Sequence, residues 1–206
     1  MNEEWKTVEQ ALNYLHKADS IPHRTEGESV LLDEISSQSR RILDIGSGDG
    51  RLLKLVLLKC PNAYGVALDF SPVMLSKLRE QYGNNNRVEI IEHDLNTPLP
   101  SILRGFDVIV SSFSIHHLSN ERKLALYTEI FHILVSGGIF CNLEHVSSPT
   151  QNLHRKFFEY IGGREDKSNI LLDVETQLKW LREIGFDEVD CYWKWRELAL
   201  LIGIRK

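Results

Sequence analysis

Short apolar runs alternate with longer amphipathic stretches between residues 41 and 145, and this alternation constrains the fold more than any other feature of the chain. Runs rich in Ile, Leu, Val and Phe predict strands over residues 41–46, 63–68, 88–91, 106–110 and 139–143. The runs at 41–46 and 106–110 are typical of strands buried on both faces. The intervening stretches predict helices, one over 52–58 and another capped by Ser119 and ending at Gly137-Gly138. Such strand–helix–strand units join neighbouring strands in parallel, so the pattern predicts a doubly wound α/β sheet with helices on both faces.

The end of the chain follows a different pattern. Apolar runs at residues 189–193 and 198–204 are separated by too few residues for a helical crossover, so we expect an antiparallel hairpin there. Together with the five earlier strands, this hairpin completes a Rossmann-like, mostly parallel sheet of seven strands, with the hairpin at one edge. Apolar residues at helical spacing predict further helices over 5–15, 30–35, 153–161 and 178–184.

The composition disfavours several classes of function. The 206 residues are enough for one domain and few for two. Asp and Glu outnumber Lys and Arg by 29 to 24, so the chain lacks the basic character that is typical of nucleic-acid binding. The three cysteines form no disulfide or metal-ligand pattern, the N-terminus does not resemble a signal peptide, and no apolar run approaches the about 18 residues of a membrane helix. We therefore expect a cytoplasmic protein with neither nucleic acid nor membrane as a partner.

The residues that follow the predicted strands carry the chemistry, because a ligand of such a sheet binds beyond the carboxyl ends of its strands. After the first strand comes a glycine-rich turn, Asp44-Ile45-Gly46-Ser47-Gly48-Asp49-Gly50, which lets a ligand approach the backbone. Asp69 follows the second strand at close to the offset of about 20 residues at which an acid meets a ribose in nucleotide-binding sheets. A dinucleotide fingerprint would need a glycine in place of Arg51, so a dehydrogenase is disfavoured.

Five motifs in order, LDIGSGDG, VALDFSPVML, EHDLNTPLP, FDVIVSSFSIHHL and LVSGGIF, resemble those of the class I S-adenosylmethionine-dependent methyltransferases. The resemblance covers roughly residues 40–145, and the C-terminal segment is similar to the hairpin that closes that family's sheet. It implies S-adenosyl-L-methionine as the cofactor and a single methyltransferase domain over 1–206. That domain would consist of a helical lid (1–39), a cofactor-binding core (40–145), a helical substrate insert (146–186) and a closing hairpin (187–206).

The first two motifs would hold the methionine and ribose parts of the cofactor. The resemblance implies that Gly46, Ser47 and Gly48 surround the methionine part. It also implies that the Asp69 carboxylate accepts hydrogen bonds from both ribose hydroxyls. Asp44 would orient the turn or accept from the cofactor's amino group; capping of backbone amides in the turn is an equally good interpretation.

The next motifs would surround the adenine and the sulfonium. Phe70 and Met74 would border the adenine, unless they are simple core residues. Asp94 would accept from the exocyclic amine and Leu95 would lie against the ring, the alternative for Asp94 being an ordinary Asx turn. The backbone of Ser111 would line the sulfonium side.

The candidate catalytic residues follow the fourth and fifth strands. Methyl transfer is an in-line displacement that depends mainly on alignment, and a general base is needed only when the nucleophile still carries its proton. His116 and His117 are the candidates for such a base, with Glu144 and His145 as weaker ones. Tandem histidines at this place also commonly support a site without touching the substrate, so both interpretations stay open.

Further candidate residues outside these motifs have two interpretations each. Arg24, with His23 in the loop between the first two helices, would clamp the carboxylate of the cofactor or of an acidic substrate, or else be a solvated loop charge. Tyr14 is open to the same two readings. Aromatic side chains of the insert would form walls of the acceptor pocket, or else belong to the core: Phe157, Phe158, Tyr160 and Trp180.

The motifs that this sequence lacks narrow the chemical class of the methyl acceptor. The chain has Ser111-Ser112-Phe113-Ser114 where amine methyltransferases of nucleic-acid bases typically carry a D/N-P-P-aromatic tetrapeptide, and it has no cysteine nucleophile near that strand. We expect a small-molecule acceptor with an oxygen or nitrogen nucleophile, and no metal, because the acidic triad of divalent-metal methyltransferases is not recognisable. A non-catalytic cofactor-binding module and aminopropyl transfer on the same fold are the alternatives. The acceptor and the oligomeric state stay open.

Overall fold

The computed structural model describes residues 21–163 and 165–206. The helix predicted over 5–15, together with Tyr14, lies outside these residues. Among the helices of the described part, none is long and apolar enough to cross a membrane.

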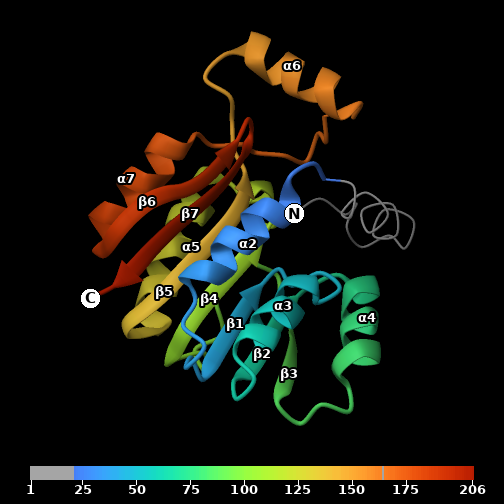
Figure 1. The fold of residues 1–206 in the computed structure, drawn as a ribbon, viewed down its shortest axis with the longest axis vertical. Coiled ribbons are helices and arrows are strands. Elements are labelled where there is room, and N and C mark those ends of the chain that lie inside the picture. The colour runs from blue at the N-terminus through green and yellow to red at the C-terminus, as the bar shows by residue number, and fades with distance from the viewer. Residues whose placement is uncertain (1–20, 164) are drawn as a thin grey trace.

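Seven strands form one sheet, which confirms the predicted strand number and direction (Figure 1). Their bounds are β1 Arg41–Ile45, β2 Tyr64–Asp69, β3 Val88–Glu92, β4 Phe106–Ser112, β5 Leu134–His145, β6 Phe186–Trp195 and β7 Leu198–Arg205. The order across the sheet is β3-β2-β1-β4-β5-β7-β6. The first five strands are parallel, and β7 pairs antiparallel with both β5 and β6, so the C-terminal hairpin lies at one edge as predicted.

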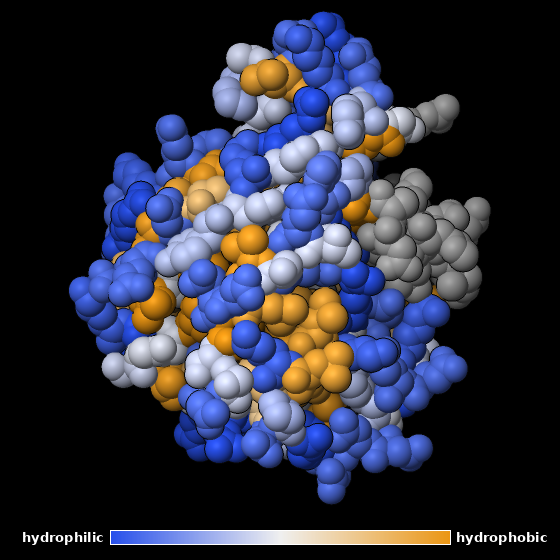
Figure 2. Space-filling model, viewed as in Figure 1, coloured by the Kyte–Doolittle hydropathy of each residue, from blue (hydrophilic) through white to orange (hydrophobic). Residues whose placement is uncertain are grey.

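Helices cover both faces of the sheet, as predicted. On one face α2 (Arg24–Glu34), α3 (Arg51–Lys59) and α4 (Pro72–Tyr82) contribute Leu31, Leu53 and Leu78 to one core cluster. On the other face α5 (Asn120–Ile133) and α7 (Val174–Ile184) contribute Leu126 and Leu181 to a second cluster. On the face shown in Figure 2, hydrophobic residues gather over α3.

The insert between β5 and β6 divides into two parts. Helix α6 (Gln151–Ile161) stands beyond the carboxyl ends of the parallel strands, away from the sheet (Figure 1). Helix α7 packs against β6, and Trp180 lies against the same cluster as Leu178 and Leu181. The aromatic side chains of this insert are therefore not gathered at one place.

The predicted end of helix α5 is wrong. Ser119 caps the helix as expected, because its Oγ accepts from the backbone N–H of Arg122 at 3.2 Å. However, the helix ends at Ile133, and Gly137-Gly138 lie within β5. The pairing of β4 with β5 jumps from Phe106–Leu134 to Val108–Ile139. Gly137, with φ of +78°, lies in the segment of β5 that this jump leaves unpaired.

Candidate functional site

The glycine-rich turn after β1 is closed at Gly46 and open at Gly48. Both glycines have left-handed backbones, with φ of +67° and +58°. A Cβ on Gly46 would lie 1.9 Å from Oγ of Ser114, so the loop after β4 passes directly against this residue. Among the described residues, no heavy atom beyond its chain neighbours lies within 4 Å of the place a Cβ would take on Gly48. The backbone at Gly48 is therefore the part of the turn that a ligand can approach.

Two polar side chains of the turn bond to the protein's own backbone. The Asp44 carboxylate is 1% exposed and accepts from the backbone N–H of Leu53 in the first turn of α3, at 3.2 Å. Burial, with the nearby charge of Asp69, raises the pKa of Asp44 to about 7. Ser47 Oγ donates to the carbonyl of Asp44 at 2.7 Å and accepts from the N–H of Leu68 at 3.0 Å. These bonds orient the turn between β1, β2 and α3.

The Asp69 carboxylate lies against the glycine turn. Its Oδ2 accepts from the backbone N–H of Gly48 and its Oδ1 from that of Ser71, both at 2.9 Å. Burial raises its pKa. Each carboxylate oxygen has two lone pairs, so both oxygens keep acceptor capacity for two hydroxyl donors. These two acceptor oxygens therefore fit the hydroxyl donors of a ribose beside Gly48.

The loop after β3 also reaches the turn. Leu95 is buried, and its Cδ1 lies 3.9 Å from the place of a Cβ on Gly46. Asp94 is part of an Asx turn, because its Oδ1 accepts from the backbone and side-chain N–H groups of Asn96, both at 2.9 Å. Across the turn, Met74 on α4 is 3% exposed, and Phe70 is half-buried. A buried Met74 agrees with a core role and is also compatible with the border of a pocket.

Arg24 is not in a loop, contrary to the prediction. It is the first residue of α2, is 7% exposed, and donates from Nε to Glu28 Oε1 at 2.9 Å. Arg51 donates to both oxygens of the same Glu28, and the Arg24 guanidinium lies 5.5 Å from the centre of the Phe113 ring. Burial acts to raise the pKa of Glu28, but the two guanidiniums outweigh it and hold that pKa below its usual value. The shared carboxylate offsets the cost of burying the Arg24 cation.

Ser111 joins two central strands. It is fully buried near the end of β4, and its Oγ donates to the carbonyl of Ile45 at 2.9 Å. The side chain therefore holds β4 to the end of β1, directly before the glycine turn.

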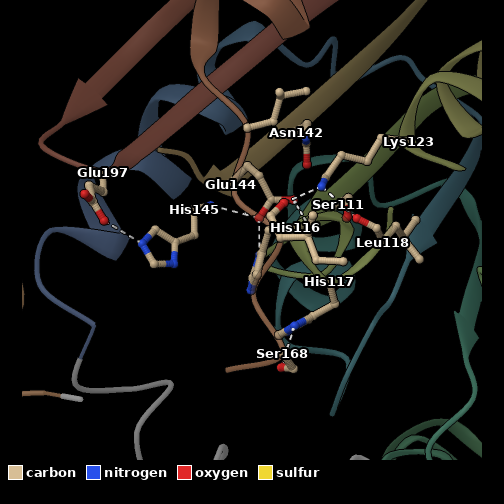
Figure 3. Close-up of polar contacts among 12 residues, drawn as sticks. Ser111, His116, His117, Leu118, Lys123, Asn142, Glu144, His145, Ser168 and Glu197 are labelled. Carbon is tan, nitrogen blue, oxygen red and sulfur yellow. Dashed lines mark hydrogen bonds and ion pairs between the residues drawn. The ribbon is translucent and has the colours of Figure 1, made fainter. Parts of the chain in front are cut away.

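His116 forms a tight pair with Glu144 at the end of β5 (Figure 3). Its Nδ1 lies 2.5 Å from Glu144 Oε1, and its backbone N–H donates to Oε2 at 3.0 Å. The backbone N–H of His145 donates to Oε1 at 2.8 Å. Burial lowers the pKa of His116 well below 6.5 and raises the pKa of Glu144 to about 7. His116 is thus a buried side chain that fixes the turn after β4 to β5.

His117 is more accessible than His116. Its ring contacts that of His116, tilted by 45°, at a centroid distance of 4.0 Å, and its Nδ1 lies 3.0 Å from Oγ of Ser168. Burial and the neighbouring His116 lower the pKa of His117 to about 3, so its imidazole is neutral at physiological pH. His117 ends the 3₁₀ turn Ile115–His117, which directly follows Ser114, the residue against Gly46. The two predicted histidines are therefore brought close to the glycine turn.

The ring of His145 bonds elsewhere. Its Nε2 lies 3.0 Å from Oε2 of Glu197 in the turn between β6 and β7. Glu197 is fully buried and also contacts His154 Nδ1 on α6 at 2.9 Å. The Phe157 ring packs against that of His145 at a centroid distance of 5.5 Å. Among the described residues, no group of three or more His, Cys, Asp or Glu side chains is arranged to hold a metal ion.

Lys123 is a residue of this site that sequence reasoning missed. It is 1% exposed, and its Nζ donates to the carbonyls of Leu118, at 2.7 Å, and Ile170. Burial lowers its pKa to about 8. A signal was present, since Lys123, Tyr127 and Ile130 share one helical face at a spacing of four and three residues. A lysine within an apolar stripe indicates a buried cation.

Comparisons with known proteins agree with this geometry. A family model described as a methyltransferase domain matches residues 42–138. The carboxy-S-adenosyl-L-methionine synthase of Nautilia profundicola is 23% identical over 90% of this chain and 87% of its own. The malonyl-[acyl-carrier protein] O-methyltransferase of Neorickettsia risticii is 33% identical over 68% of this chain and 55% of its own.

Among solved structures, an O-methyltransferase family protein from Burkholderia thailandensis has the same fold, with a TM-score of 0.76 at 18% identity. The similarity covers 98% of this chain and 61% of that one. This chain spans less than two thirds of the length of these two O-methyltransferases. From the matching family model, the relatives, the sheet order and the glycine turn with its acidic partner, we conclude that the chain belongs to the class I S-adenosylmethionine-dependent methyltransferases, with S-adenosyl-L-methionine as its cofactor.

Proposed function

We propose that this protein transfers a methyl group from S-adenosyl-L-methionine to an oxygen or nitrogen of a small molecule. The observation that supports the proposal most is the contact of Ser114 with Gly46, because His117, whose imidazole is neutral, follows Ser114 by three residues. The bound cofactor supplies an electrophilic methyl group on a positively charged sulfur. The protein's own task is to align an acceptor with that methyl group and to remove the acceptor's proton.

The cofactor would bind along the carboxyl ends of β1, β2 and β4. The backbone around Gly48 would border its methionine part, and Asp69 would accept from the ribose hydroxyls. Arg24, which Glu28 holds in place, would bind the cofactor's carboxylate through its guanidinium. The remaining predicted contacts keep the roles that the family resemblance implies: Asp44, Ser47, Phe70, Met74, Asp94, Leu95 and Ser111. Gly46 packs against Ser114 and would support the turn.

His117 would act as the general base. Because its pKa is held far below 7, the imidazole is neutral at physiological pH and has a lone pair for the proton of a hydroxyl or amine nucleophile. The same low pKa makes it a weak base, so the proton would move only as the bond to the methyl carbon forms. His116 would support the His117 ring, since the two rings are in contact and His116 is held by Glu144.

A small-molecule acceptor agrees with several observations. The formal net charge of −5 disfavours a polyanionic acceptor. Relatives of this chain bear the names of small-molecule methyltransferases, among them demethylmenaquinone and phosphoethanolamine N-methyltransferases. We infer that α6 covers the acceptor, because it stands over the carboxyl ends of the strands (Figure 1).

The test is release of S-adenosylhomocysteine over a panel of small hydroxyl and amine compounds, with the methylated product identified by mass spectrometry. With a hydroxyl acceptor, His117→Gln is expected to lower kcat by about 10²- to 10⁴-fold, the usual contribution of a general base. His132→Gln changes an exposed histidine at the end of α5 and should leave kcat unchanged. Cofactor binding without turnover on any compound would favour a non-catalytic module, and an unaffected H117Q variant would remove the base assignment.

One observation favours a second candidate. A relative that matches along nine tenths of this chain is named for the synthesis of carboxy-S-adenosyl-L-methionine. The same mass spectrometry distinguishes the two functions, because a carboxylated cofactor is heavier than S-adenosyl-L-methionine, whereas methyl transfer leaves the lighter S-adenosylhomocysteine.

A further inference from the structure

Residues 166–172, here named the strap, lie across the turn that carries the two histidines. The backbone N–H of Ile170 donates to the carbonyl of His116 at 2.8 Å, and Lys123 Nζ donates to the carbonyl of Ile170. Further along, the N–H of Ser147 donates to the carbonyl of Leu172 at 3.1 Å. The strap is therefore bonded to η2 (Ile115–His117), to α5 and to the segment after β5, and it brings Ser168 to the His117 ring (Figure 3).

Ser168 is itself held by Asp166. The carboxylate Oδ1 of Asp166 accepts from both the backbone N–H and the Oγ–H of Ser168, each at 2.8 Å. Burial acts to raise the pKa of Asp166, but the two Ser168 donors and the nearby histidines outweigh it and lower that pKa. Asp166 is therefore ionised at neutral pH and can only accept hydrogen bonds.

The direction of these bonds determines the proton position on His117. A hydroxyl has a single hydrogen, and a hydrogen bond to an ionised carboxylate is stronger than one to a neutral acceptor. The Ser168 hydrogen therefore points to Asp166, and its Oγ must accept from His117 Nδ1 at 3.0 Å. A neutral imidazole carries one N–H, so the lone pair of His117 is on Nε2.

We propose that Asp166 and Ser168 are positioning residues that hold His117 in the tautomer with the proton on Nδ1 and the basic lone pair on Nε2. The tautomer follows from the contact at Nδ1, whereas its catalytic use rests on the proposed function. In that reaction the acceptor's proton would move to Nε2, and the electron pair of the broken bond would stay on the acceptor atom to form the bond to the methyl carbon. The bond between the methyl carbon and sulfur would break at the same time, its electron pair would go to the sulfur, and S-adenosylhomocysteine would leave. The charge that appears on the imidazolium is stabilised through Ser168 by the Asp166 carboxylate.

The direct test is a long-range ¹H–¹⁵N NMR experiment on protein labelled with ¹⁵N-histidine at neutral pH. The His117 resonances are assigned by their loss in His117→Gln. We expect a protonated Nδ1 and an unprotonated Nε2 in the wild-type protein, and a mixture of the two tautomers in Ser168→Ala. Ser76→Ala, at an exposed serine on α4, should leave the spectrum unchanged. A wild-type ring protonated on Nε2, or a Ser168→Ala ring that keeps its tautomer, would overturn the proposal.

The second test concerns turnover. With a hydroxyl acceptor, Ser168→Ala should lower kcat about tenfold, the effect of one lost hydrogen bond, with little change in KM, and Ser168→Thr should restore it. A confirmed tautomer in a protein that transfers no methyl group would refute the proposed function and leave this inference standing. Normal turnover by Ser168→Ala in an active enzyme would contradict the positioning role.

Discussion

Gly46 and Gly48 have similar backbones and opposite surroundings, and this difference separates the structural from the binding part of the turn. Both have positive φ, which costs a residue with a Cβ about 1–2 kcal/mol. Among the described residues, a Cβ on Gly48 would meet no atom within 4 Å. A Cβ on Gly46 would lie 1.9 Å from Oγ and 2.4 Å from Cβ of Ser114. The Ser114 Cβ is fixed to its backbone and cannot rotate away.

The pair therefore gives a matched prediction. Gly46→Ala should lower the free energy of unfolding by about 2–5 kcal/mol, the sum of backbone strain and overpacking. Gly48→Ala should cost only about 1–2 kcal/mol, because a Cβ there meets open space among the described residues. Urea denaturation of both variants measures the difference. Equal losses would contradict the assignment of Gly46 to the packed side of the turn.

Single residues also show what sequence reasoning can reach. Asp69 and the glycines were predicted to share a site because both follow parallel strands, and the Gly48–Asp69 hydrogen bond brings them together. Arg24 was placed in a loop because Ser20-Ile21-Pro22 breaks the helical pattern directly before it. Its burial depends on Glu28 and on Arg51 arriving from another helix, a contact that no local spacing reveals.

At the scale of elements, buried strands were the most predictable feature, because their apolar runs are unbroken. Strand β5 was the exception, since Gly137-Gly138 reads as a helix stop while the structure uses it to change the register against β4. Helix α6 was predicted, but its position was not. That position depends on contacts with the turn between β6 and β7, which lies far along the chain.

Helix α6 is held to that turn by a histidine–carboxylate contact and by aromatic side chains. His154 Nδ1 lies 2.9 Å from Glu197 Oε1, and its Nε2 lies 3.2 Å from Glu165. The Arg196 guanidinium lies 4.7 Å from the centre of the Tyr160 ring. Burial acts to lower the pKa of His154, but the two carboxylates outweigh it and raise that pKa above 6.5.

The docking of α6 should therefore depend on pH. Because the folded pKa of His154 is raised, its contribution is fully present below 6.5 and is lost as pH rises through the folded value. From pH 6 to pH 9, amide exchange in α6, corrected for its intrinsic pH dependence, should speed up about two- to fivefold, the worth of a partly exposed ion pair. His154→Gln should remove this change. The same pH response in the variant would contradict this role of His154.

At the scale of the whole molecule, the strand order explains why the site lies where it does. β1 lies between β2 and β4 in the sheet. The glycine turn, Asp69 and the turn Ile115–His117 therefore meet at the carboxyl ends of these three strands. The hydrogen bond from Gly48 to Asp69 and the packing of Ser114 on Gly46 are the two contacts that join them. The proposed methyl transfer depends on binding of the cofactor at these carboxyl ends.

Calorimetric titration of S-adenosyl-L-methionine into the wild-type protein and Asp69→Ala tests that claim most directly, with Asp33→Ala, at an exposed carboxylate on α2, as the control. The wild-type protein and the control should bind with equal affinity. Asp69→Ala should bind at least about tenfold more weakly, a loss of ~1.4 kcal/mol, because two hydroxyl donors lose a charged acceptor. No heat of binding with the wild-type protein, or an unchanged affinity in a folded Asp69→Ala, would contradict the account.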